Sequence, residues 1–300
     1  MSLSALLALI AAGFLLKHLT RKESVFNFIG FVANDILLSF FVLASIAGRG
    51  LDYLLSIKTV FFYVAAVMLI SLTGSYLYGL YFIRQDRGWR GALMVLSIFP
   101  NTAALGFPVV AIFTPDLTPA VLYSAASSLL SIPLATFFAI RYSQEQSRFR
   151  ETVTATFLFP PVTISLISLA LVAFGIKLPE KFLTLAEKIG WWCLPLVLVY
   201  FGSRLQLKKI PVRKIMETGL FRMLLPLCFI LLSLRLTSRS VFFAVLIESI
   251  MPPAIMAASI LARHGLKAEE STAVTMILTL MAILLITILK ITGLASALAG

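Results

Sequence analysis

Two stretches of this chain place proline and polar side chains inside long apolar segments. The first is residues 97–108, Ser-Ile-Phe-Pro-Asn-Thr-Ala-Ala-Leu-Gly-Phe-Pro, and the second is residues 248–254, Glu-Ser-Ile-Met-Pro-Pro-Ala. Proline removes a backbone donor and clashes with the preceding turn, so both segments should be interrupted helices. Interrupted backbone within a membrane is tolerated only where protein buries it or where it lines a wet cavity. One such segment in each half of a chain indicates the binding site of a secondary transporter.

The chemistry that we expect at the two breaks is the binding of an anion. Gly106 and Pro108 predict a break and a new helix start in the first segment, because proline suits the first helical position; Pro252-Pro253 predicts the same in the second. Each new helix start presents free N–H groups and a positive dipole end, and two such ends crossing near the midplane would accept a carboxylate. The alternative is a pair of kinked helices with no ligand. The residues expected at this site are Asn101, Thr102, Gly106, Pro108, Ser249, Pro252 and Pro253.

Two carboxyl groups lie within apolar segments. Glu248 is one helical turn before Pro252, and Asp35 follows Asn34 in the middle of another segment. An intramembrane carboxyl group is a functional hypothesis by default. Glu248 could carry a coupling proton, since desolvation favours a neutral carboxyl, or it could bind a cation or cap broken backbone. Asp35 is a weaker candidate for contact with substrate or proton, because its segment has no predicted break.

Hydroxyl side chains recur at helical spacing in two further segments. Ser124 and Ser128 share one helix face with Ser127 and Ser131, and Thr275 and Thr279 share one with Thr272. These stripes could line a polar path. Small residues also let helices pack closely, and packing is the interpretation that we favour.

The composition indicates which elements must position these groups. The chain has 300 residues, of which 60% are hydrophobic and 13% are charged, and the apolar residues form long runs typical of a polytopic all-α membrane protein. A cleaved signal peptide would need basic residues before the first apolar run, whereas Lys17 follows it. We expect ten transmembrane helices, with the fourth and ninth broken and crossing, near residues 2–17, 24–48, 57–83, 91–113, 118–142, 153–175, 183–203, 218–236, 240–263 and 271–292.

The basic residues predict the orientation of these helices. Of the 25 Lys and Arg residues, sixteen fall in one set of alternate loops and eight in the other. The positive-inside rule puts the richer set in the cytoplasm and both termini outside, in a multi-pass protein of the plasma (inner) membrane. The remaining residue, Arg222, is expected to snorkel from the eighth helix.

The two halves of the chain are predicted to be repeats. Residues 1–150 and 151–300 each hold five expected helices, and an odd number makes the second half enter the membrane in the opposite sense, as an inverted repeat. An offset of about 151 relates Pro100 to Pro252, Ser124 to Thr275 and Ser128 to Thr279. The basic connector near residues 141–152 is the expected joint between the halves.

Other classes of function lack support in the sequence. There is no P-loop pattern, no HExxH motif and no nucleophile elbow, and no residues are spaced as metal ligands. We therefore expect no enzyme activity, no metal and no cofactor. The basic loops contain Trp89 and Phe149, which we interpret as interfacial anchors, and no nucleic-acid partner is expected.

Several motifs resemble those of the auxin efflux carrier family, which includes the plant PIN proteins and bacterial permeases proposed for malonate or malate. The resemblance covers nearly the whole chain. It is carried by residues 101–108 (Asn-Thr-Ala-Ala-Leu-Gly-Phe-Pro), Phe159-Pro160-Pro161, Leu178-Pro179, residues 195–202, residues 251–254 (Met-Pro-Pro-Ala) and residues 261–265 (Leu-Ala-Arg-His-Gly).

The resemblance implies a fold shared in outline with bile acid–sodium symporters and sodium–proton antiporters. Helices 1, 2, 6 and 7 would form a scaffold that is often dimeric, and helices 3–5 and 8–10 a moving domain. Asn101, Pro108 and Pro252 would then lie at the crossing and help to hold a carboxylate. The chain departs from the family in its second helix, where Ala33-Asn34-Asp35-Ile36 replaces a proline with small apolar neighbours. The long central loop of plant carriers is absent, so the chain looks like a bacterial-type member.

The expected function is therefore secondary active transport, as an efflux permease, of an organic anion such as a small carboxylate or an auxin-like acid. Access to the midplane site would alternate between the two sides of the membrane. The alternatives are a sodium-coupled symporter in the same fold, and a membrane receptor or sensor that only binds. An intramembrane enzyme would need paired catalytic groups, for which Glu248 and Asp35 are the only candidates.

Overall fold

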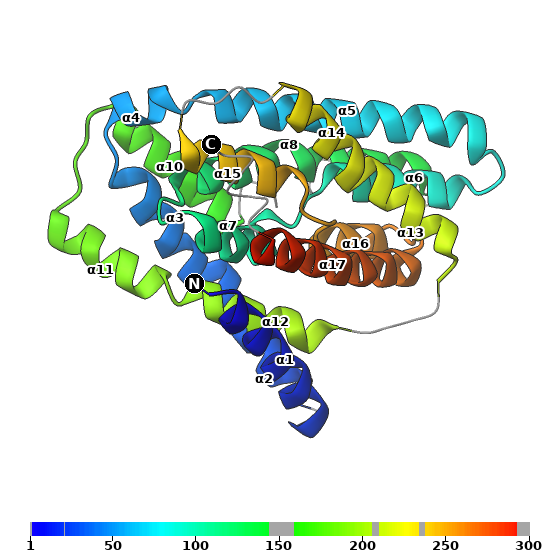
Figure 1. The fold of residues 1–300 in the computed structure, drawn as a ribbon, viewed down its shortest axis with the longest axis horizontal. Helices are drawn as coiled ribbons and strands as arrows, with labels where there is room; N and C mark the ends of the chain where they lie inside the picture. The colour runs from blue at the N-terminus through cyan, green and yellow to red at the C-terminus, as the bar shows by residue number, and fades with distance from the viewer. Residues whose placement is uncertain (1, 21, 144–158, 206–209, 234–237, 293–300) are drawn as a thin grey trace.

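The computed structural model describes residues 2–20, 22–143, 159–205, 210–233 and 238–292. These residues form helices joined by short connections (Figure 1). In chain order the elements are α1 (Leu3–Thr20), α2 (Glu23–Phe31), η1 (Val32–Leu37), α3 (Leu38–Ala47), α4 (Leu51–Ser56), α5 (Thr59–Phe82), α6 (Arg87–Ile98), η2 (Thr102–Gly106), α7 (Phe107–Phe113), α8 (Thr118–Tyr142), α10 (Pro160–Ala173), α11 (Glu180–Gly190), α12 (Cys193–Arg204), α13 (Val212–Gly219), η3 (Leu220–Leu224), α14 (Leu225–Ser233), α15 (Arg239–Ser249), α16 (Ile255–Arg263) and α17 (Ala268–Ile291).

Seven continuous helices in the described part of the chain are long and apolar enough to cross a membrane. They are Leu3–Thr20, Glu23–Ala47, Thr59–Phe82, Thr118–Tyr142, Glu180–Arg204, Val212–Ser233 and Ala268–Ile291. These helices are compatible with an integral all-α membrane protein. Shorter helices occupy the positions of the other three expected spans, and the full count of ten and the inverted repeat stay predictions. Most of the expected joint, residues 144–152, and Phe149 with it, lies outside the described residues.

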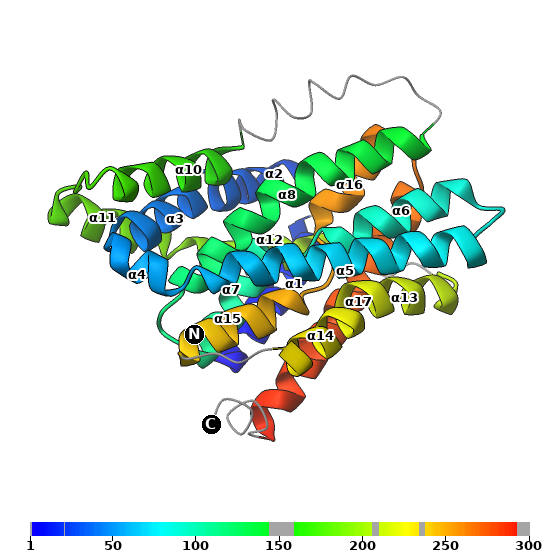
Figure 2. The same cartoon turned by 90° about the horizontal axis from the view of Figure 1, so that it is seen from above.

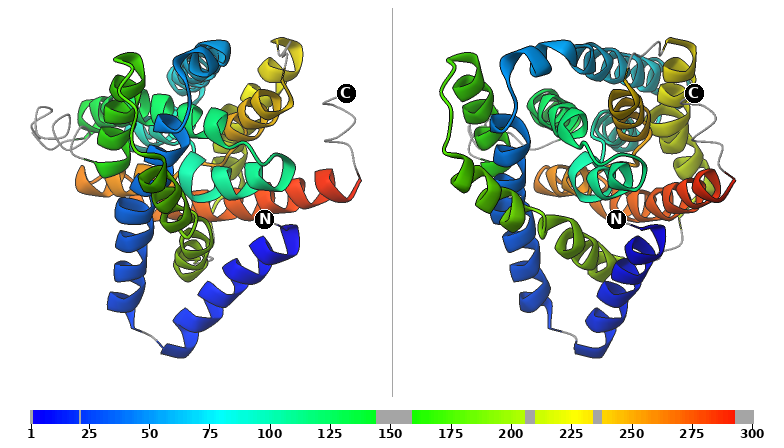
Figure 3. Two further views of the ribbon diagram at one scale, coloured as in Figure 1. Left: turned by 90° about the vertical axis from the view of Figure 1, so that its left-hand side faces the viewer. Right: turned by 60° about the vertical axis from the view of Figure 1, so that its left-hand side comes forward.

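The helices form two groups. In the first group, α1 packs on α12, α10 and α11 pack on α3, and α2 with η1 packs on α12. In the second group, α5, α6 and α8 pack together, with α15, α16, α17 and the α13–α14 helix around them. Figure 3 shows α1 and α2 splayed in a V at the edge of the molecule, away from the second group. The groups meet mainly where α8 contacts α3 and α10, and where α12 contacts η2 and α7.

Glycine brings two helices of the first group into backbone contact. A Cβ atom on Gly13 of α1 would lie 2.0 Å from the carbonyl oxygen of Val199, and one on Gly202 of α12 would lie 2.0 Å from that of Ile10. Such small residues allow membrane helices to approach closely enough for extensive dispersion contact. The α1–α12 pair therefore depends on the absence of side chains at both positions.

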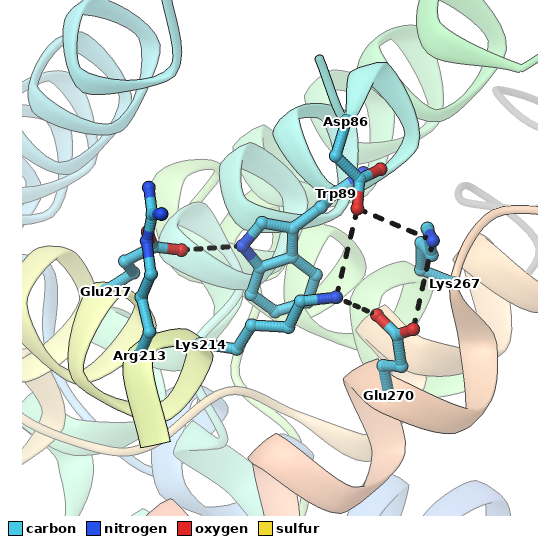
Figure 4. Close-up of polar contacts among 7 residues, drawn as sticks. All are labelled: Asp86, Trp89, Arg213, Lys214, Glu217, Lys267 and Glu270. Atoms are coloured by element: carbon cyan, nitrogen blue, oxygen red, sulfur yellow. Dashed lines mark hydrogen bonds and ion pairs between the residues drawn. The ribbon is translucent and has the colours of Figure 1, made fainter. Parts of the chain in front are cut away.

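A polar network ties the second group together at the end of the bundle that holds the α5–α6 turn (Figure 4). Glu217 of α13 is 5% exposed and accepts hydrogen bonds from the Tyr78 hydroxyl (3.0 Å), Trp89 Nε1 (2.7 Å) and Arg213 Nε (2.7 Å). These bonds join α5 and α6 to α13. Trp89 is 2% exposed, so its interpretation as an interfacial anchor is wrong. Its indole N–H instead donates a hydrogen bond to the buried carboxylate of Glu217.

A second part of the same network continues to α17. Lys214 Nζ lies over the Trp89 ring, 4.6 Å from its centroid, and contacts the carboxylates of Asp86 (3.9 Å) and Glu270. Lys267 lies 3.5 Å from Asp86 and 3.8 Å from Glu270. The alternating charges connect the starts of α6 and α17 to α13, and so join helices from the two halves of the chain.

Substituting Gly202 with alanine should destabilise the protein, because neither backbone can move away from the new Cβ without separating α1 from α12. Overpacking of this kind costs about 1–3 kcal/mol. We expect a lower midpoint of thermal unfolding in detergent for Gly202→Ala and for Gly13→Ala. Gly50→Ala is the control, since no atom lies within 4 Å of the Cβ position there. Equal midpoints for all three variants would contradict the close contact.

Candidate functional site

The two interrupted segments cross and pair through their backbones. Helix α6 ends at Ile98 and η2 begins at Thr102, whereas α15 ends at Ser249 and α16 begins at Ile255. Between these ends, Asn101 N–H donates to the Pro252 carbonyl (2.8 Å) and Ala254 N–H donates to the Phe99 carbonyl (2.9 Å). Pro100 and Pro253 thereby oppose each other in an isolated antiparallel bridge. The expected crossing of two broken helices is present, and each break supplies partners for the other.

The first break lies earlier in the sequence than expected. The helix runs without interruption from Thr102 to Phe113, so the predicted break at Gly106 and new start at Pro108 are wrong, and the chain leaves its helix around Pro100 instead. Residues 102–106 form a π-helical turn, closed by a bond from Gly106 N–H to the Asn101 carbonyl (3.1 Å). Such wide turns are known within continuous helices, and here Pro108 lies at the start of the α-helix that follows.

Gly106 has a different role, which is to make room for Glu248. A Cβ atom at Gly106 would lie 2.0 Å from Oε2 of Glu248. Glu248 is fully buried, and neither carboxyl oxygen has a hydrogen-bond partner among the described residues. An unpartnered buried carboxyl group is costly, which marks this position as one where a proton or cation would be stabilising.

Arg222 is the main feature that the sequence interpretation missed. It is 1% exposed and does not snorkel. From the π-helical turn η3, its guanidinium donates to three carbonyls: Nε to Met251 (2.9 Å), Nη1 to Ser97 (3.1 Å) and Nη2 to Ser249. These carbonyls lie at or just beyond the C-terminal ends of α6 and α15, where the helix dipoles are negative. An arginine in the middle of the apolar span Val212–Ser233 was the available signal.

A cavity of about 430 Å³ lies beside the crossing, between the two groups of helices. One wall comes from α2, η1 and α12, and the other comes from the crossing, α8 and α16. The lining includes four predicted residues, Asp35, Asn101, Thr102 and Ser128, together with residues that were not predicted: Gly30, Asn34, Leu38, Phe99, Pro100, Ala103, Ala104, Ile132, Phe159, Tyr200, Phe201, Ala254, Ile255, Met256, Ser259 and Arg263.

The polar groups of this cavity favour an anion near the crossing. Asn101 is 5% exposed, and its side-chain Nδ2 has no hydrogen-bond partner among the described residues. The first turns of η2 and α16 line the same cavity, and the first N–H groups of a helix have no partner within it. Arg222 neutralises the negative C-terminal ends of α6 and α15. These ends therefore do not cancel the positive N-terminal ends of η2 and α16, which face the cavity. Arg263 adds a cation at the far end of α16, and Asp35 adds one carboxyl group.

The remaining predicted residues do not line this cavity. Thr102 and Ser124 share a hydrogen bond between their hydroxyls (2.7 Å), and Ser124 lines a small adjoining cavity of about 30 Å³. Ser249 shares one with the buried Tyr123 (3.1 Å). The Thr279 hydroxyl donates to the Thr275 carbonyl (2.8 Å). The predicted residues outside the lining of the main cavity are Gly106, Pro108, Ser124, Glu248, Ser249, Pro252, Pro253, Thr275 and Thr279.

Comparison of the chain with protein-family models and with curated protein sequences finds no match.

Replacing Arg222 with methionine should destabilise the crossing strongly, because three buried carbonyls would lose their donor. Each buried carbonyl left without a hydrogen-bond donor costs about 1–3 kcal/mol. We expect a large fall in the thermal midpoint in detergent for Arg222→Met. The fall should be smaller for Arg222→Lys, whose single ammonium cannot reproduce the fork. The control is Arg239→Met, which removes an exposed arginine. Similar midpoints for Arg222→Met and Arg239→Met would show that the guanidinium does not stabilise the crossing.

Proposed function

We propose that this protein is a secondary active transporter that moves a small organic anion by alternating access. The observation that carries the proposal is a cavity lined by Asn101 and by the first turns of two half-helices. The buried amide nitrogen of Asn101 has no hydrogen-bond partner among the described residues. A carboxylate at this point accepts hydrogen bonds from the Asn101 amide and from free backbone N–H groups, and its charge is stabilised by two positive dipole ends. The cavity volume of about 430 Å³ suits a small metabolite.

The location of the cavity supports movement of one helix group against the other. The cavity extends from the crossing to Arg263, at the end of the bundle that the basic residues assign to the cytoplasm. Its walls belong to different groups, whereas the crossing and the Glu217 network lie within the second group. We infer that α5–α8 and α13–α17 move as a rigid body past a scaffold of α1–α3 and α10–α12, and that the cavity then opens to the other side.

The resemblance to the auxin efflux carrier family supports the same division into scaffold and moving domain, and it suggests efflux as the direction. It also suggests a homodimer formed through the scaffold helices, in the plasma (inner) membrane with both termini outside. Sodium-coupled symport is the alternative that a specific observation favours, since Asp35 places a carboxyl group in the cavity. A receptor or sensor that only binds the anion would show no flux.

Transport should depend on the Asn101 side chain. In proteoliposomes loaded with labelled C3–C5 dicarboxylates or indole-3-acetate, we expect saturable flux of at least one of these acids. We expect Asn101→Ala to lower its kcat/KM by about tenfold or more, as one lost hydrogen bond to a charged group implies. The control is Asn27→Ala, which removes an exposed amide outside the cavity. Absence of flux for every acid, with folded wild-type protein, would reject the organic-anion proposal.

Coupling to an ion should depend on a carboxyl group, and two conservative variants distinguish the candidates. Asp35 lines the cavity, whereas Glu248 is sealed beneath the crossing against Gly106. We expect Asp35→Asn to retain flux down the substrate gradient and to lose its acceleration by an imposed pH or sodium gradient. Glu248→Gln should keep that acceleration. Loss of gradient dependence in Glu248→Gln alone would assign coupling to the buried carboxyl instead.

A further inference from the structure

A groove of about 700 Å³ lies on the outer face of the second helix group and is lined by none of the residues of the crossing. Helices α5, α6 and α8, which run side by side along this face in Figure 2, form its walls. The residues that line it are Leu72, Thr73, Tyr76, Leu80, Arg87, Arg90, Met94, Phe137, Phe138, Arg141 and Tyr142.

The apolar part of the groove faces outward from the bundle. Leu72, Tyr76 and Leu80 are spaced by four residues and form one stripe along α5, and Phe137 lies on the facing helix α8. Tyr76 is 41% exposed and Phe137 is 48% exposed. Because α5 and α8 are both long enough to span a membrane, these side chains would contact lipid chains.

The polar part of the groove is a cluster of three arginines at one end. Arg87 Nη2 donates to the carbonyl of Arg141 (3.0 Å), and the Arg87 guanidinium lies 6.0 Å from the centre of the Tyr142 ring. Arg90 donates through Nε (3.2 Å) and Nη2 (2.8 Å) to the carbonyl of Ile83, at the end of α5. Among the described residues, none of the three guanidinium groups pairs with a carboxylate.

Capping of helix ends does not account for all of this charge. The carbonyls that Arg87 and Arg90 contact lie at the C-terminal ends of α8 and α5, and each such end carries roughly half a negative charge. Two ends therefore offset about one of the three positive charges. Among the described residues, the groove therefore keeps an excess of positive charge at the ends of α5 and α8, directly beside its apolar stripe.

We propose that this groove binds an anionic phospholipid, with the phosphate at Arg87, Arg90 and Arg141 and one acyl chain along the α5 and α8 stripe. Basic pockets between membrane helices are a known way to recognise acidic lipid headgroups. A soluble anion would use the arginines alone, whereas a phospholipid fills both parts of the groove. The proposal depends on membrane insertion and is independent of which substrate the protein moves.

The test is binding of phosphatidylglycerol to the full-length protein purified in detergent. Native mass spectrometry and thermal unfolding would be followed during titration with phosphatidylglycerol, and phosphatidylcholine would be the neutral comparison. We expect preferential binding and stabilisation by phosphatidylglycerol. Since each arginine near an anionic headgroup contributes roughly a fivefold gain in affinity, Arg87→Gln/Arg141→Gln should weaken binding by about 25-fold.

Two controls separate this groove from general charge attraction and from misfolding. Lys22→Gln/Arg84→Gln removes the same charge from exposed positions outside the groove, in loops that the basic residues assign to the same side of the membrane, and should bind like the wild type. Thr73→Trp fills the groove at an exposed position while keeping all three arginines, and should also weaken binding. Equal loss in both double variants, or unchanged binding in Thr73→Trp, would overturn the proposal.

A final comparison distinguishes a lipid site from a site for free phosphate esters. Glycerophosphoglycerol, which is phosphatidylglycerol without its acyl chains, carries the same single negative charge as the lipid headgroup. We expect it to compete with phosphatidylglycerol only at concentrations at least a hundredfold higher, because it leaves the apolar stripe empty. Competition at equal concentrations would reject the phospholipid and identify an anion site.

Discussion

A backbone that leaves its helix within an apolar layer must find new partners for its N–H and C=O groups, and this constraint organises the structure. The solution here is mutual, because the break around Pro100 and the break around Pro253 form two hydrogen bonds with each other. Arg222 satisfies three further carbonyls at the adjoining helix ends. Helices from both halves of the chain must therefore converge on one point, and the packing of α6, α8, α13 and α15 around it follows.

The same arrangement places the negative helix ends on one side of the crossing and the positive helix ends on the other. The guanidinium occupies the side where the half-helices α6 and α15 end, so the positive starts of η2 and α16 remain on the side of the cavity. Glu248 lies buried close to Arg222 in the second helix group, sealed from that cavity by Gly106 and its neighbours. The proposed anion site thus depends on backbone dipoles and one amide, with little use of charged side chains. Such a site binds without the strong desolvation penalty of a buried ion pair.

The sequence is sufficient to predict the features that depend on local chemistry. Pro252-Pro253 marked the second break correctly, whereas the first break lies around Pro100, ahead of the predicted Gly106. Apolar run length located the long helices, because it depends on neighbouring residues alone. The roles of Arg222, Gly106 and Trp89 were not predictable in this way. Arg222 contacts carbonyls on two other helices, Gly106 accommodates a carboxyl group from α15, and Trp89 donates to Glu217 on α13. Each role is determined by a partner more than twenty residues away, and periodicity contains no information about such a partner.

The pairing of the two breaks has a consequence for biosynthesis. Asn101 and Pro252 are separated by roughly 150 residues, so the first half of the chain leaves the ribosome well before its backbone partner exists. Until α15 and α16 are made, the open amide and carbonyl groups around Pro100 require water or the insertion machinery as their partners. The indole N–H of Trp89 likewise lacks its acceptor until Glu217 has been synthesised. The nascent first half is thus an incomplete membrane protein, and the arrival of α13 to α16 completes the assembly of helices that were inserted much earlier.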